Sequence, residues 1–119
     1  MTTTAVVTVA VTVAMNAFSG IAALLHWKLI LPGMAKADVP ESWLTFPIGT
    51  LKTAGAAGLL VGLLIEAPWL VAAAAVGLVL FFVCSLYTHV RAADYTAQFG
   101  LAVVFLGTAS ASLVFTLTA

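Results

Sequence analysis

The sequence predicts an all-α polytopic membrane protein, an up-down bundle of four transmembrane helices, on three observations. Apolar residues make up 64% of the 119 residues and charged residues only 7%, whereas soluble domains carry about 25% charged residues. The mean hydropathy is +1.23. Apolar stretches of about 20 residues, the length that crosses a bilayer as a helix, fill most of the chain. Lipid offers the backbone no hydrogen-bonding partners, so each stretch is expected to be helical.

The first expected helix covers residues 4–27 and ends before Pro32, because proline interrupts a helical pattern. The next segment, 33–43, holds two acids, one lysine and one proline, and is expected to form an interfacial loop or a short surface helix. The second helix covers 47–65. Pro47 falls in its first turn, where the missing N–H costs no hydrogen bond.

The third and fourth expected helices cover 68–88 and 98–118, and the whole chain is expected to form one domain. A tight turn at 66–69 precedes the third helix, and the polar stretch 88–98 joins it to the fourth. Short connections make neighbouring helices antiparallel, which gives the up-down order of the bundle.

Small residues mark a packing surface on the second helix, where Ala54, Gly58 and Gly62 are spaced four apart. Small residues at this spacing let helices approach closely in a bilayer. Either a helix of the same chain or a second protomer could fill this groove. A homo-oligomer is therefore one of two open interpretations.

The positive charges predict an orientation. Lys28, Lys36, Lys52 and Arg91 all fall on the side of the first and third connections, whereas both ends of the chain and Glu66 fall on the other. Because lysine and arginine favour cytoplasmic loops, both termini are expected outside and the two polar connections in the cytoplasm.

The charge balance argues against nucleic-acid binding, and the cysteine content argues against a disulfide or a cysteine-based metal site. A formal net charge of zero argues against a nucleic-acid partner, because phosphate binding needs clustered lysine and arginine. Cys84 is the single cysteine, so neither an internal disulfide nor a cysteine-based metal site is expected. The expected surroundings are a lipid bilayer.

A polar stripe follows the first helix. It consists of Thr8, Thr12, Asn16, Ser19 and His26, whose spacings keep them on one helical face. Such a face is expected to point into the bundle. In one interpretation the hydroxyls bond to carbonyls of their own helix and Asn16 bonds one neighbour. In the other, Asn16 and Ser19 line a buried polar crevice.

A second polar group gathers at the predicted cytoplasmic ends and is the candidate site. Histidine titrates near neutral pH and can act as acid, base or ligand, and His26 and His89 are the only histidines. The catalytic candidates are His26, His89 and Asp94, and the ligand-binding candidates are Asn16, Trp27, Lys52, Tyr87 and Arg91. Lys28 and Tyr95 belong to the same cluster. No metal site is predicted.

A structural interpretation competes with this site. The lysines and Arg91 could extend to the lipid headgroups while the tryptophans and tyrosines form interfacial belts. Arg91 could also pair with Asp94, Asp38 or Glu41. Two histidines from different helices could hold a haem iron axially, but no sequence signature supports haem.

The chain resembles the DoxX-like family of small bacterial four-helix membrane proteins in three stretches. These are HWKLIL at 26–31, IGTLKTAGAAGLLVGLL at 48–64 and LYTHVRAADY at 86–95. The third carries the His-x-Arg-x-x-Asp ending that this family tends to show, although Ala93 stands where the family often has glycine. The resemblance implies a bacterial cytoplasmic membrane protein, and some relatives are subunits of quinone-reducing oxidoreductases.

Three functions follow as hypotheses. The first is a membrane subunit of an oxidoreductase that binds a quinone or docks a redox enzyme at the cytoplasmic cluster. The second is a self-contained membrane enzyme, of isomerase or epoxide-opening type, in which His26 or His89 is the acid or base for an apolar substrate. The third is a non-catalytic bundle that binds lipid or acts as a scaffold.

Overall fold

Four long helices form the protein in the computed structural model, which describes residues 1–118. They are α1 (Thr3–Leu24), α3 (Thr50–Leu64), α4 (Pro68–Arg91) and α5 (Ala97–Leu117), with a short helix α2 (Leu31–Lys36) between the first two. Four segments are long and apolar enough to cross a membrane. The described residues include no β-strand. The predicted all-α four-helix membrane bundle is therefore confirmed.

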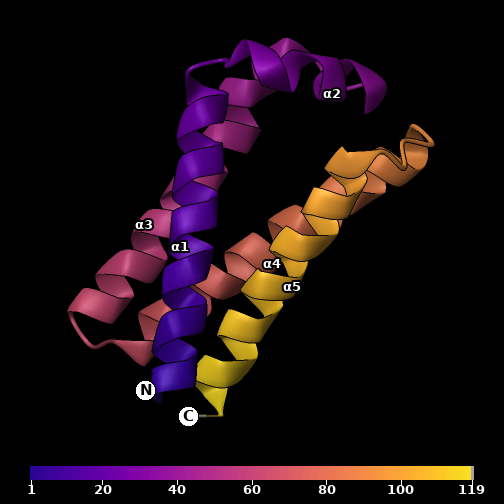
Figure 1. The fold of residues 1–119 in the computed structure, drawn as a ribbon. Helices are drawn as coiled ribbons and strands as arrows, with labels where there is room; N and C mark the ends of the chain where they lie inside the picture. The colour runs from indigo at the N-terminus through magenta and orange to yellow at the C-terminus, as the bar shows by residue number, and fades with distance from the viewer. Residues whose placement is uncertain (119) are drawn as a thin grey trace.

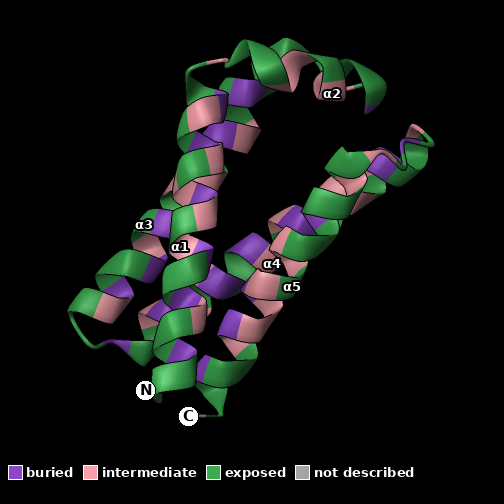
Figure 2. Ribbon diagram, in the orientation of Figure 1, coloured by how far each residue is buried: buried purple, intermediate pink, exposed green. Residues whose placement is uncertain are grey.

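The long helices pack in a ring in which α1 contacts α3 and α5, and α4 contacts the same two helices. Figure 1 shows that the α1–α3 pair and the α4–α5 pair converge near the two termini and diverge at the end that carries α2. The core cluster, which includes Val9, Leu59, Val71, Leu78 and Ala109, lies where the pairs converge. Exposed residues cover the outer faces of the helices (Figure 2).

Close contact between α3 and α4 depends on glycine. A Cβ added to Gly62 would lie 2.6 Å from Val71 Cγ2, and one added to Gly58 would lie 3.0 Å from the Ala74 Cβ. The small-residue groove is therefore filled by α4 of the same chain. Ala54, which was expected on this face, is instead exposed, and Gly55 packs there against Leu78.

The end of α1 differs from the prediction. The helix ends at Leu24, because His26 adopts φ 51° and the N–H groups of His26 and Trp27 bond back to the carbonyls of Ala23 and Ala22. This is the Schellman arrangement, which closes a helix through a left-handed residue. His26 therefore lies beyond the polar stripe, and Pro32 opens α2 instead of stopping the first helix.

The segment between α1 and α3 forms a roof across the open end of the bundle. After α2 the chain makes a 3₁₀ turn at Glu41–Leu44 and an irregular turn at Thr45–Gly49, and then enters α3. A Cβ on Gly33 of α2 would meet Gln98 Cγ of α5 at 2.9 Å. Arg91 Nη2 at the end of α4 donates to the backbone carbonyl of Asp38, 3.3 Å away. The roof thus reaches from the α1–α3 pair to the α4–α5 pair (Figure 1).

Candidate functional site

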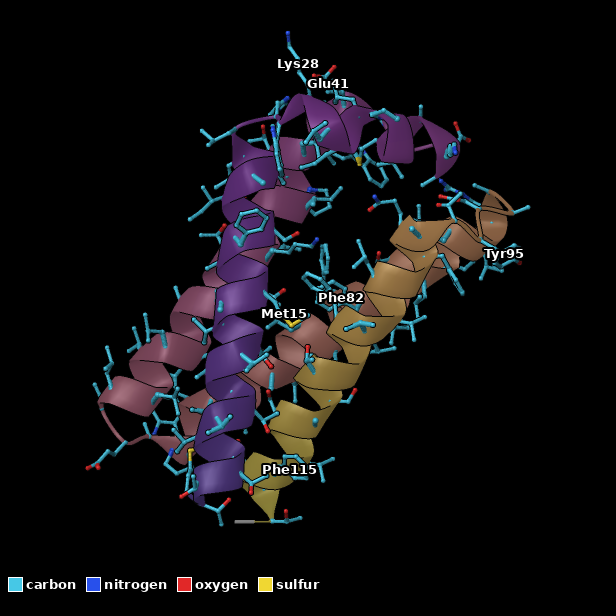
Figure 3. The ribbon with its side chains drawn as sticks, viewed as in Figure 1. Met15, Lys28, Glu41, Phe82, Tyr95 and Phe115 are labelled. Carbon is cyan, nitrogen blue, oxygen red and sulfur yellow. The ribbon has the colours of Figure 1, made fainter. Side chains whose placement is uncertain are left out.

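A cavity of about 540 Å³ occupies the space between the diverging helix pairs beneath α2. Phe82 belongs both to the core cluster and to the cavity lining, so it forms the floor of the cavity. Figure 3 shows Phe82 between the two pairs. Most of the lining is apolar. The polar side chains in the wall are Ser19, Lys52, Ser85, Thr88, His89 and Gln98.

Lys52 places its ammonium group inside this cavity. Its Nζ lies 2.8 Å from Ser19 Oγ. The same nitrogen lies 5.8, 5.5 and 5.1 Å from the ring centres of Phe81, Phe82 and Phe105. These distances are within the range of cation–π attraction. The interpretation in which Lys52 extends to the headgroups is therefore wrong, because the side chain turns toward the interior of the bundle.

His89 and Asp94 form a buried pair at the roof end of the cavity. His89 Nδ1 lies 3.0 Å from Asp94 Oδ2, and both side chains are almost completely buried. A carboxylate only accepts, so Nδ1 carries the hydrogen and donates it. The other ring nitrogen, Nε2, makes no hydrogen bond within residues 1–118. His89 lines the cavity, and its ring meets Phe99 edge-on at 6.1 Å.

The end of α4 makes this pair. Ala93 adopts φ 52°, and the Asp94 N–H bonds the His89 carbonyl at 2.8 Å. This reversal brings the Asp94 side chain back over the last turn of the helix. The Thr96 side chain is the largest cause that lowers the pKa of Asp94 below its usual value. The Thr96 N–H, which donates to Asp94 Oδ1 at 3.2 Å, and the His89 ring add to this shift.

The polar stripe on α1 lies deeper, toward the termini. The Thr12 hydroxyl contacts the Thr8 carbonyl at 2.8 Å and Ser112 Oγ of α5 at 2.8 Å. Asn16 Nδ2 donates to the Thr12 carbonyl at 3.0 Å, which fits the interpretation based on carbonyls of the same helix. Asn16 Oδ1 is buried and has no hydrogen-bond partner in the described part of the chain. Of this stripe, Ser19 lines the cavity and Asn16 does not.

The remaining candidates lie outside the cavity lining. His26 Nε2 contacts Thr45 Oγ1 at 2.8 Å and its Nδ1 lies 3.5 Å from Glu41, so His26 joins the end of α1 to the start of the α3 segment. Trp27 and Tyr87 are exposed. The structure thus brings Lys52 and His89 to one cavity and places His26 in a separate group of contacts. Within residues 1–118 no cluster of three metal-ligating side chains occurs.

The model of the DoxX-like family matches residues 6–112. The chain belongs to this family. No curated protein and no solved structure matches it. The match includes all three stretches on which the resemblance rests, and it extends over the four long helices up to Ser112. For this DoxX-like protein, the His-x-Arg-x-x-Asp ending has a structural explanation, since His89 and Asp94 pair and Arg91 holds the roof.

Sequence reasoning missed the aromatic part of the site. Phe81, Phe82 and Phe105 surround the Lys52 ammonium, and Met34 of α2 contributes to the cavity lining. An aromatic residue in an apolar helix carries no sign of whether it faces lipid or a cavity. The one available signal in this DoxX-like chain was Lys52 itself, because a cation inside a transmembrane segment requires partners.

Proposed function

We propose that this DoxX-like protein binds a lipid-soluble molecule of quinone type in the cavity, as a membrane subunit of an oxidoreductase. The observation that carries the proposal is an apolar cavity within the membrane segments whose wall presents His89, fixed by Asp94. Cavities of about 300–1,000 Å³ with an apolar lining and few polar groups are typical of small-molecule sites.

The polar groups are placed at two levels. Lys52 lies over Phe82, and His89 follows Phe82 by seven residues on the same face of α4. Seven residues correspond to about 10 Å along a helix. A ring with oxygens at both ends would therefore have one polar group toward the floor and one beneath the roof.

The chain's own residues suit proton exchange with such a ring. With Nδ1–H donated to Asp94, His89 Nε2 is free to accept a proton from a hydroxyl group, and the Asp94 carboxylate stabilises the resulting imidazolium. In the reverse direction the imidazolium donates from Nε2. This is the arrangement of a general acid–base pair. A bound quinone would supply the electron-accepting chemistry.

The approach to the cavity is from the bilayer. Leu51, Leu80 and Leu101 line the cavity and are also exposed on the surfaces of the membrane segments. An apolar molecule can thus enter between the helix pairs without crossing water. The roof side carries Lys28, Lys36 and Arg91, which supports a cytoplasmic position for this end in a bacterial membrane and a place there for a redox partner.

The test is native mass spectrometry of the protein in mild detergent with decylubiquinone added. Gly77 lines the cavity and a Cβ there meets open space, so Gly77→Leu should fill the cavity without disturbing packing. Gly107 is an equally uncrowded helical glycine outside the lining, and Gly107→Leu is the matched control. We expect a quinone adduct that Gly77→Leu and His89→Ala weaken and Gly107→Leu leaves intact. An adduct equally abundant in all four proteins would overturn the proposal.

A second candidate is supported by the His89–Asp94 pair alone. The same pair could serve a self-contained membrane enzyme that moves protons on an apolar substrate, with His89 as the acid or base. The genes that neighbour this one would distinguish the two candidate functions. A neighbouring gene for a sulfur or superoxide enzyme favours the oxidoreductase subunit, and a terpenoid or polyketide gene cluster favours the self-contained enzyme. Spectra that contain only phospholipid adducts, unchanged by His89→Ala, would favour a scaffold.

A further inference from the structure

The Lys52 ammonium lacks the partner that a buried cation normally has. An ammonium has three donors, and Ser19 Oγ is the single hydrogen-bond acceptor that residues 1–118 provide. Both ion pairs among these residues involve histidine, His26 with Glu41 and His89 with Asp94. No carboxylate of the described chain therefore pairs with Lys52. Lysine inside a transmembrane segment usually pairs or marks a ligand path.

The position of Lys52 makes this lack of a partner significant. Lys52 lies twelve residues before Leu64 at the far end of α3, which is about 18 Å along the helix. Lys28, in contrast, projects from the roof end away from the bundle (Figure 3). The Lys52 side chain turns toward Ser19 and the aromatic floor. Its unused donors are thus inside the cavity, next to apolar walls.

We propose that the cavity also takes a second class of ligand, an apolar acid whose carboxylate lies against Lys52 and Ser19. This inference goes beyond the proposed binding of a quinone-type molecule and concerns the same cavity. The apolar body fits the leucine- and phenylalanine-rich wall, and entry past Leu51 and Leu80 keeps that body in contact with lipid. His89, about two helix turns nearer the roof, is left to contact a second oxygen of the ligand.

The aromatic floor also favours an acid over a neutral head. Three phenylalanine rings accept the ammonium charge only partially through their faces, and they offer no hydrogen-bond acceptors. A carboxylate supplies both the opposite charge and two acceptor oxygens. An ester can also accept a hydrogen bond from the ammonium, so the acid gains the attraction between the two opposite charges, for which we expect an affinity difference of about tenfold or more.

The experiment compares hexadecanoic acid with its methyl ester, which has the same chain and no charge. Binding to the purified full-length protein is measured by native mass spectrometry and by titration with radiolabelled ligand. We expect the acid to bind about tenfold more tightly than the ester. Lys52→Met should abolish the difference, Lys52→Arg should keep most of it, and Lys28→Met, the surface control, should leave it unchanged.

Several outcomes would overturn the inference. Equal affinities of acid and ester for the wild type would do so, as would a preference that persists in Lys52→Met. If Lys52→Met fails to fold, Ser19→Ala in a folded protein provides the second test, and an unreduced preference there has the same meaning. Phosphatidic acid that displaces hexadecanoic acid at equal concentration would assign the site to an anionic phospholipid head instead.

Failure of this inference can be told from failure of the proposed function. Suppose that decylubiquinone binding depends on Gly77 and His89 while the acid and the ester bind equally. The proposed quinone binding then stands, and the proposal of an acid ligand is wrong. If none of the three molecules binds to the cavity, both are wrong.

Discussion

The turn that positions the His89–Asp94 pair carries backbone strain that one substitution should relieve. Ala93 has φ 52°, in the left-handed region where an L-residue with a Cβ is disfavoured by about 1–2 kcal/mol and glycine is not. Ala93 is exposed, so its methyl group contributes little packing. Part of the gain is lost because glycine also adds freedom to the unfolded chain. We therefore expect Ala93→Gly to stabilise the protein by about 1 kcal/mol.

The neighbouring alanine supplies the control. Ala92 is the C-cap residue that follows Arg91 at the end of α4, and it has φ −86° and ψ 2°, which alanine adopts without strain. Ala92→Gly should therefore destabilise by about 0.5–1 kcal/mol, the ordinary cost of glycine in a helical conformation. Two adjacent alanines should respond to the same substitution with opposite signs.

Thermal unfolding in detergent, followed by circular dichroism, measures both variants. A gain of 1 kcal/mol corresponds to a rise in Tm of about 4 °C for a chain of this length. Equal losses in Ala92→Gly and Ala93→Gly would refute the assignment of a left-handed turn at Ala93. Since that turn directs Asp94 onto His89, such a result would also remove the basis for the buried pair.

Three further predictions follow from packing, hydrogen bonding and titration. Gly62→Leu should destabilise by about 2 kcal/mol or more, since even its Cβ would crowd Val71, and thermal unfolding would show the loss. Thr12→Val and Ser112→Ala, combined in a double-mutant cycle, should show a coupling of about 1 kcal/mol for their 2.8 Å contact; a coupling near zero would contradict it. The lowered pKa of Asp94 means that the unfolded carboxyl binds its proton first as pH falls. Its stabilisation is therefore present above the usual carboxyl pKa of about 4 and is lost as the pH falls below that value, so Asp94→Asn should flatten the Tm–pH profile between about pH 5 and 2.

The sequence predicted the membrane helices because their signal is local. Each span is a run of apolar residues, and lipid leaves the backbone no alternative to a helix. The errors lie where the cause is geometric. Pro32 was expected to end the first helix, but α1 had already ended at Leu24 through the left-handed His26. Histidine is enriched among non-glycine residues with positive φ, but the conformation is uncommon even for histidine, so the residue type alone does not predict it.

The candidate site was predicted in part for a similar reason. His89 and Asp94 are five residues apart, so the end of one helix was enough to bring them together. Lys52 was predicted as a ligand-binding residue, but its surroundings come from three other helices, which no local pattern indicates. Because the two helix pairs diverge, residues at the same predicted depth, such as His26 and His89, lie in separate groups of contacts.

The divergence of the helix pairs itself follows from where the small residues lie. Gly55, Gly58 and Gly62 let α4 approach α3 along the half of the bundle near the Glu66 turn. Toward the roof α3 presents Leu51 and Lys52 to the cavity, and α4 presents Phe81 and Phe82, all of which are much larger than the glycines of the other half. Close packing at one end and bulky side chains at the other separate the pairs and create the cavity. The placement of Lys52 in the half with bulky side chains, and of Gly55, Gly58 and Gly62 in the other, argues that the opening is a property of the sequence and that Lys52 contributes to a site within it.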